Sequence, residues 1–406
     1  MKVLQVNCVY NKGSTGKITY DIHAGLLSEG IESVICYGRG DKTKDANVYK
    51  TCGELYSKAN NLLSRFTGVM YGGCTFSTSK LISIIKKEKP DIVHLQCING
   101  YFVNIYSLIE WLKDNRIKTI LTLHAEFMHT ANCGHALDCE KWKTGCGNCP
   151  RLKKETKSLW LDGTAKSWKK MKAAFDGFKD LTVVSVSPWL LERASASPIL
   201  AGKNHKVILN GLDDSIFRLR KADNLRNIYA PNGEKIIFHA TPSFNDDPGH
   251  IKGGCFILEM AKRLADKNIK FVVAGRHSEQ LKVPSNVTLL GNVREQDKLA
   301  RLYSMADLTL IASKKETFSM IAAESLCCGT PIVGFKAGAP EQITIDEYSS
   351  FVEYGDIDAL QNAVEHFLSI DVDKSKISTD GRAKYSKKRM VAEYIEVYKK
   401  AMKGEI

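Results

Sequence analysis

The sequence has 406 residues, enough for two or three domains, each with its own core. Its 44% hydrophobic and 25% charged residues are typical of a globular protein, and thirty glycines and ten prolines exclude collagen-like and low-complexity classes. The net charge of +13 favours anionic partners such as phosphates or an acidic membrane surface, but no recognition motif supports binding of nucleic acid. No apolar run approaches the roughly 18–20 residues of a membrane helix. Residues 1–7 indicate a strand rather than a signal peptide, so we expect a cytoplasmic protein.

Short apolar runs alternate with longer amphipathic segments, as in parallel sheets covered by helices. In the first half we predict strands at 3–9, 33–37, 91–96, 119–124 and 181–187, with helices at 18–29, 80–89 and 106–115. A strand at 206–209 and a turn at 210–213 lead to the second half. There we predict strands at 235–240, 270–274, 287–290, 308–312, 331–334 and 350–352, with helices at 254–267, 296–305, 321–327 and 359–367.

This alternation predicts an α/β protein with two doubly wound, Rossmann-like parallel sheets. We place the first domain at 1–209 and the second at 210–387. The last segment, 388–406, contains an apolar stripe at helical spacing. We expect it to form a helix that packs back on the first domain.

The most informative segment is 313–324, where a predicted strand ends, a polar loop follows and a helix begins near Phe318 or Ser319. A helix start at the carboxyl edge of a parallel sheet offers free N–H groups to an anion. Glu316 lies in the loop, and Glu324 lies nearly two turns inside the helix. Two carboxylates near one crevice suit a ligand that is rich in hydroxyl donors.

The spacing of Glu316 and Glu324 resembles the E-x7-E segment of retaining glycosyltransferases of the GT-B fold, specifically glycosyltransferase family 4. Segments 329–333, 210–217, 90–94 and 385–386 resemble other parts of that family. The resemblance implies two Rossmann-like domains that face a central cleft and a nucleotide-sugar donor. It assigns Glu316 to the donor sugar and Glu324 to the nucleotide ribose. It places the backbone amides around Phe318, Ser319 and Met320 at the sugar and diphosphate.

The resemblance also indicates phosphate-binding and catalytic groups, with two departures from the family pattern. Lys252 begins a helix as in the family and is expected to neutralise the departing diphosphate. The family's arginine after the first strand of the second domain is missing, and Arg276 is a candidate to replace its charge. His124 matches a histidine of the family near the donor sugar. Its usual acidic neighbour is absent, and Glu126 lies one residue further along.

The loop 11–17 contains Gly16-Lys17 and suggests a P-loop, which would make the protein a nucleotide kinase or ATPase. The full pattern needs glycine at position 11 and serine or threonine at position 18, where this chain has Asn11 and Ile18. We therefore interpret Gly13 and Gly16 as donor-binding positions where the backbone approaches the ligand closely.

Four cysteines lie within a Cys-rich insertion at about 125–180: Cys133, Cys139, Cys146 and Cys149. A structural zinc ion is one interpretation, and free thiols or disulfides are the others. Segment 151–179 combines nine lysines and arginines with Trp160, Trp168, Phe175 and Phe178. It suits either the inner leaflet of the cell membrane, with peripheral association, or a solvated amphipathic helix with buried rings.

Together these features predict a retaining, hexosyltransferase-type glycosyltransferase that builds a bacterial surface polysaccharide. The donor would be a nucleoside-diphosphate sugar, the acceptor a saccharide or lipid-linked saccharide, and no cofactor would be required for catalysis. The alternatives are a catalytically degenerate sugar-nucleotide-binding protein and a P-loop-like nucleotide enzyme. The sequence does not specify the sugar, base, acceptor, linkage or oligomeric state.

Overall fold

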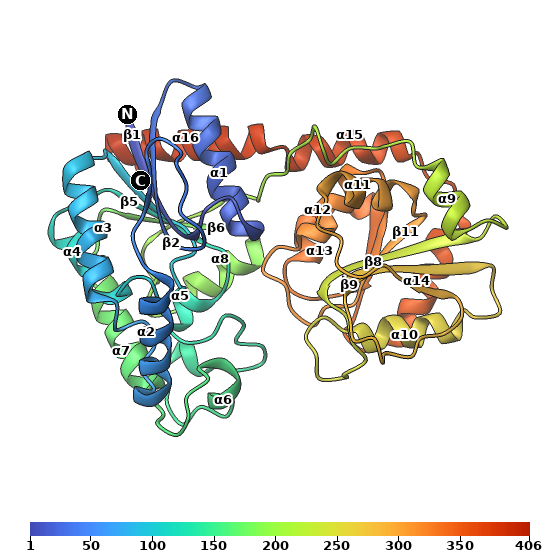
Figure 1. Ribbon diagram of the computed structural model, residues 1–406, viewed down its shortest axis with the longest axis horizontal. Coiled ribbons are helices and arrows are strands. Elements are labelled where there is room, and N and C mark those ends of the chain that lie inside the picture. The colour runs from blue at the N-terminus through green and yellow to red at the C-terminus, as the bar shows by residue number, and fades with distance from the viewer. The chain divides into compact units, whose positions relative to one another are not determined.

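The computed structural model describes residues 1–406 (Figure 1). The chain folds into two compact units, the first comprising 1–209 with 390–406 and the second 210–389. Each unit contains one parallel sheet with helices around it. The predicted fold class, α/β with two doubly wound sheets, is confirmed.

The first unit has a seven-stranded sheet in the order β3-β2-β1-β4-β5-β6-β7. Its strands are β1 (Lys2–Val9), β2 (Glu32–Arg39), β3 (Val48–Lys50), β4 (Ile92–Leu95), β5 (Thr119–Leu123), β6 (Leu181–Ser185) and β7 (Asn204–Val207). Its helices are α1 (Gly13–Ser28), α2 (Glu54–Thr67), α3 (Thr75–Glu88), α4 (Ile105–Asp114), α5 (Phe127–Thr130), α6 (Leu152–Glu155), α7 (Thr164–Phe175) and α8 (Pro188–Ser195), with a 3-10 turn at Lys141–Lys143. Every strand pair is parallel, so all carboxyl ends lie at one edge.

The C-terminal helix α16 (Lys387–Lys403) contributes Met390, Tyr394 and Tyr398 to the core of the first unit. A polar network anchors it there. His94 on β4 contacts the Tyr398 hydroxyl through Nδ1 and the Thr122 hydroxyl through Nε2, at 2.7 Å each. Burial lowers the pKa of His94 to about 3, so the ring stays neutral and both contacts are neutral hydrogen bonds.

The second unit has a six-stranded sheet in the order β10-β9-β8-β11-β12-β13. Its strands are β8 (Lys235–Ser243), β9 (Ile269–Arg276), β10 (Val287–Leu289), β11 (Leu308–Ile311), β12 (Ile332–Phe335) and β13 (Ser349–Val352). Its helices are α9 (Asp223–Tyr229), α10 (Gly254–Arg263), α11 (Gln296–Met305), α12 (Met320–Cys327), α13 (Pro340–Ile343), α14 (Ile357–Ser369) and α15 (Lys374–Tyr385), with a 3-10 turn at Asp346–Tyr348. Apolar side chains of β8, β9 and β11 pack against α10 and α14 to form its core.

The structure adds elements that the sequence patterns did not single out, among them α2, α8 and α15. Within 151–179 it shows α7, the amphipathic helix that was one of the two alternatives there, with Trp168 and Phe175 buried. Helix α1 begins at Gly13, five residues before the predicted start, because its first turn has no apolar periodicity. Strand β8 continues to Ser243 through a bulge between Ala240 and Ser243. No helix combines the length and apolar character needed to cross a bilayer.

Candidate functional site

In the second unit, the carboxyl ends of β8 and β11 bring together Lys252 and Glu316, 64 residues apart in sequence. Lys252 Nζ donates to Glu316 Oε1 at 2.6 Å, and both side chains are largely buried. The two loops are also joined by their backbones, since Lys314 N donates to Ile251 O at 2.8 Å. An ammonium and a carboxylate are thus held together at the edge where open α/β sheets bind ligands.

Gly253 explains how Lys252 reaches this position. Its φ of +64° is in the left-handed region, and a Cβ there would lie 2.0 Å from the carbonyl oxygen of Ala312. Only glycine allows the chain to pass so close to the end of β11 and then start α10 at Gly254. Lys252 therefore lies just before the N-terminus of α10, where the helix dipole also favours an anion.

Helix α12 begins directly after the Glu316 loop. Ser319 is its N-cap, has a φ of +82°, and accepts a hydrogen bond from Ala322 N through its hydroxyl. A positive φ at a non-glycine residue costs energy and is common at ligand-binding turns. Phe318 is buried and packs edge-on against Tyr385, so its ring is part of the core, and Met320 is the first helical residue. Backbone N–H groups at such a start have no partner within the helix.

Glu324 lies inside α12, partly buried, and has no cation beside it. The Tyr303 hydroxyl donates to its Oε2 at 2.9 Å. Burial raises the pKa of Glu324 from 4.5 to about 7, although the Tyr303 hydrogen bond opposes this shift. The carboxyl therefore titrates near neutral pH. Glu324 and Glu316 make no hydrogen bond with each other.

Arg276 ends β9, and its guanidinium Nε donates to Pro242 O at 3.4 Å, just beyond the buried part of β8. Pro242 lies in the segment where the family pattern has an arginine and this chain does not.

His239 on β8 was not identified from sequence. It is buried, its Nδ1 contacts Leu310 O at 2.9 Å, and its Nε2 has no hydrogen-bond partner. Burial, with a contribution from the charge of Lys252, lowers its pKa to about 4. Its place inside an apolar strand explains why no sequence motif indicated it.

In the first unit, His124 follows β5 and its Nε2 lies 2.8 Å from Gln96 Oε1. Gln96 Nε2 donates to Gln5 Oε1, so the Gln96 oxygen accepts and His124 Nε2 carries the proton. Burial lowers the pKa of His124 to about 4 and keeps the imidazole neutral. Glu126 does not serve as its acidic partner. Glu126 is fully buried and its Oε1 accepts from Arg193 Nε at 2.6 Å.

The loop after β1 is closed on itself, because Asn11 N donates to Gly16 O at 3.1 Å. Gly13 has a φ of +63° at the first residue of α1, and a Cβ on Gly16 would lie 3.0 Å from the Val9 side chain. Lys17 forms an ion pair of 3.0 Å with Asp21 on the same helix. The lysine of the suspected P-loop therefore has a structural partner.

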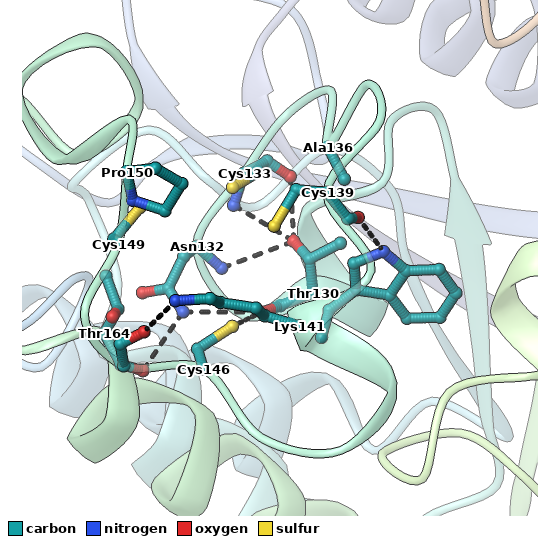
Figure 2. A pocket seen from close by; sticks show the side chains of 12 residues that line it. Thr130, Asn132, Cys133, Ala136, Cys139, Lys141, Cys146, Cys149, Pro150 and Thr164 are labelled. Carbon is teal, nitrogen blue, oxygen red and sulfur yellow. Dashed lines mark hydrogen bonds between the residues drawn. The ribbon is translucent and has the colours of Figure 1, made fainter.

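Figure 2 shows the cysteine cluster, in which all four sulfurs line one small cavity of about 20 Å³. Cys133, Cys139, Cys146 and Cys149 are partly buried free thiols. The Lys141 ammonium is held among them by the carbonyl oxygens of Gly147 and Asn148. No group of three or more His, Cys, Asp or Glu side chains in the structure is positioned to hold a metal ion. The structural zinc therefore stays a prediction.

The two parallel sheets, with an ammonium and a carboxylate paired before helix starts on the carboxyl edge of the second, and the family match of this region define the class of protein: a glycosyltransferase of the GT-B fold. Residues 249–384 match the family model of Glycosyl transferases group 1, and this segment contains Lys252, Glu316 and Glu324. The chain is 22% identical to WcaC of Escherichia coli strain K12, whose name assigns it to colanic acid biosynthesis as a glycosyl transferase. That alignment covers 98% of this chain and 99% of the relative.

A second relative is the N-acetyl-alpha-D-glucosaminyl L-malate synthase of Bacillus anthracis. It is 23% identical over 68% of this chain and 65% of its own length. Among solved structures, sucrose-phosphate synthase from Thermosynechococcus elongatus matches with a TM-score of 0.67 at 15% identity, covering 100% of both chains. HepE of Anabaena, solved with UDP and glucose, matches with a TM-score of 0.64 at 13% identity, covering 98% of this chain and 99% of its own. These structures share the fold with this chain.

Proposed function

We propose that this protein is a retaining, family 4 glycosyltransferase that moves a sugar from a nucleoside-diphosphate donor to a saccharide or lipid-linked saccharide. The observation that carries the proposal is the Lys252–Glu316 pair inside the group 1 region. Its ammonium suits a diphosphate and its carboxylate suits sugar hydroxyls. The WcaC name and the UDP and glucose in HepE support a role in surface polysaccharide synthesis with a nucleotide-sugar donor.

The ion pair requires an exchange of partners when the donor binds. Lys252 leaves Glu316 and contacts the diphosphate, while Glu316 is freed to accept hydrogen bonds from sugar hydroxyls. Because each charge gains a new partner as it loses the old one, neither is left buried and unpaired. Glu324 accepts hydrogen bonds from the ribose, and the N–H groups at the start of α12 contact the diphosphate. Arg276, beside Pro242, contributes the charge of the missing arginine.

In the proposed reaction the bond between the anomeric carbon and the diphosphate oxygen breaks, and its electron pair stays on the phosphate. Lys252 stabilises that developing charge more strongly in the transition state than in the bound donor. The acceptor hydroxyl forms the new bond on the face that the phosphate leaves, and its proton passes to the departing phosphate. Configuration at the anomeric carbon is therefore retained, without a metal as a required cofactor. From the first unit, the neutral His124 imidazole, oriented by Gln96, contributes a hydrogen bond to the donor sugar.

Calorimetric affinities for UDP, GDP, dTDP, ADP and ATP, each with and without Mg²⁺, test the donor class. We expect one diphosphate to bind selectively and without metal. Binding of Mg-ATP alone would contradict the proposal and support the P-loop alternative. Selective diphosphate binding without turnover, for every sugar donor of the preferred base, would instead support the degenerate binding protein.

A further inference from the structure

Most of the large apolar side chains that the structure leaves exposed lie in one region of the first unit. Leu55 is 83% exposed and Trp160 is 68% exposed, which is unusual for side chains of this size. We call this region the α2 patch, and its members are Leu55, Leu62, Leu63, Phe66, Trp160 and Leu161. Phe76, 80% exposed at the start of α3, packs against Tyr56 of α2 and extends the region.

A shared helix face and direct contacts connect members of the α2 patch. Leu55, Leu62 and Phe66 follow each other at intervals of seven and four residues, so they share one face of α2. Trp160 packs edge-on against Phe66, with ring centroids 5.7 Å apart. The Trp160 loop is tied to the end of α2, because Leu159 N donates to Arg65 O at 2.9 Å. The remaining large exposed apolar side chains of the chain include Leu27, Ile228 and Ile370, far from α2 in sequence.

Exposed lysines accompany the α2 patch on α2, α6, α7 and the loop between them, and Figure 1 shows these helices at the same end of the first unit. They are Lys58, Lys153, Lys154, Lys157, Lys166 and Lys170. The carboxylate of Asp162 in this region already accepts hydrogen bonds from Cys149 N and Thr164 N. Protein–protein interfaces are depleted in lysine, whereas membrane-surface segments combine lysine with Trp, Phe and Leu. The composition therefore favours an anionic lipid surface over a protein partner.

A cavity of about 230 Å³ lies beside the α2 patch, and two lysine side chains are among the residues that line it. Leu63 belongs to both the patch and the cavity wall, and Lys166 and Lys170 of α7 line the other side. An apolar surface next to two ammonium groups matches a lipid at the membrane surface, with acyl chains on one side and a phosphate on the other.

We propose that the α2 patch docks this protein on an anionic phospholipid bilayer, with the leucines and aromatic rings in the headgroup boundary and the lysines at the phosphates. The sequence pattern had directed attention to Trp160, Trp168, Phe175 and Phe178 as candidate membrane residues. The last three are buried in the core, and only Trp160 joins the patch. The inference rests on the proposed function only for its biological use, which is access to a lipid-linked acceptor.

Co-sedimentation with lipid vesicles tests this inference without donor or acceptor. The full chain is mixed with vesicles of phosphatidylcholine alone or of phosphatidylcholine with phosphatidylglycerol. We expect binding to the anionic vesicles only. A triple variant, Leu62→Ser with Phe66→Ser and Trp160→Ser, should bind at least about tenfold more weakly. Replacement of both Lys166 and Lys170 by Glu should also weaken binding to anionic vesicles and lower its sensitivity to salt, because less of the remaining binding is electrostatic.

The matched control is a second triple variant, Leu27→Ser with Ile228→Ser and Ile370→Ser, which removes exposed apolar area elsewhere in the chain. It should bind vesicles as the unmodified protein does. Thermal unfolding and diphosphate affinity should be unchanged in both triple variants, which separates membrane docking from donor binding. Absence of vesicle binding, equal loss in the control, or a dimer that the α2 variant dissociates would each overturn the inference. Any of these results would leave the proposed transferase activity standing.

Discussion

Replacing Glu324 with Gln should make the protein more stable at pH 8 and, at the same time, weaken its binding of nucleoside diphosphates. Burial raises the pKa of Glu324 from 4.5 to about 7, and that difference corresponds to about 3 kcal/mol of free energy. Because the side chain keeps some contact with water, we expect about 2 kcal/mol. A glutamine oxygen can accept the same hydrogen bond from Tyr303, which stands 2.9 Å from Glu324 Oε2, so little else is lost.

The sign of the pH dependence follows from proton linkage. The folded chain holds its proton on Glu324 more tightly than the unfolded chain does, so ionisation of the unfolded state disfavours folding as the pH rises from about 4.5 to about 7. The cost is nearly absent below about pH 4.5 and complete above about pH 8. Glu324→Gln should therefore raise the melting temperature by about 6 °C at pH 8 and by little at pH 4.5.

Thermal unfolding of the unmodified protein and the variant at both pH values tests this reasoning, with Glu259→Gln as control. Glu259 is an exposed carboxylate that pairs with Arg263 on α10, and its replacement should change stability by less than about 0.5 kcal/mol at either pH.

Calorimetry at pH 8 should show that Glu324→Gln lowers affinity for the preferred diphosphate by about tenfold or more, because a neutral amide accepts weaker hydrogen bonds from ribose hydroxyls. Destabilisation at pH 8, or an equal shift at both pH values, would refute the electrostatic argument. Unchanged affinity would refute the ribose assignment.

Four further outcomes are expected. Lys252→Ala should weaken diphosphate binding by about tenfold or more, whereas Lys262→Ala, an exposed lysine on the following helix α10, should not; calorimetry compares them, and equal effects would contradict the phosphate role. His124→Ala should slow sugar transfer by about a hundredfold while diphosphate affinity stays constant; parallel loss of both would make His124 structural. Protein purified without chelator should carry about one zinc per chain by elemental analysis, and Cys149→Ser should lower that content; a content well below one would exclude the zinc. Lys17→Ala should leave nucleotide affinity unchanged because Lys17 already pairs with Asp21; loss of Mg-ATP binding would revive the P-loop alternative.

The architecture could be predicted because apolar periodicity marks buried strands and amphipathic helices directly. The strand at Leu308–Ile311, the glycine at 253 and the helix at Met320–Cys327 all have local signatures, and together they locate the sheet edge proposed to bind the donor. Helix α2 was not predicted, although its apolar residues share one face, and its unusual feature is that this apolar face is exposed instead of buried. That same feature makes it a candidate docking surface.

Side-chain pairing in the site could not be predicted, because it depends on contacts between segments far apart in the chain. Nothing in the sequence indicates that Lys252 pairs with Glu316, or that Glu324 has only a tyrosine hydroxyl beside it. The sequence also left the partner of His124 open. In the structure His124 donates a hydrogen bond to Gln96, and Glu126 pairs with Arg193. These pairings determine which contacts the proposed donor would displace.

The most direct test of the account follows the anomeric proton by NMR while the protein acts on the sugar donor of its preferred base, with the matching acceptor or with water. We expect release of nucleoside diphosphate and a first product with the same anomeric configuration as the donor, and both should be reduced in Lys252→Ala. Release with inverted configuration would contradict the retaining mechanism. No release from any donor whose diphosphate binds would contradict the assignment of this site to sugar transfer.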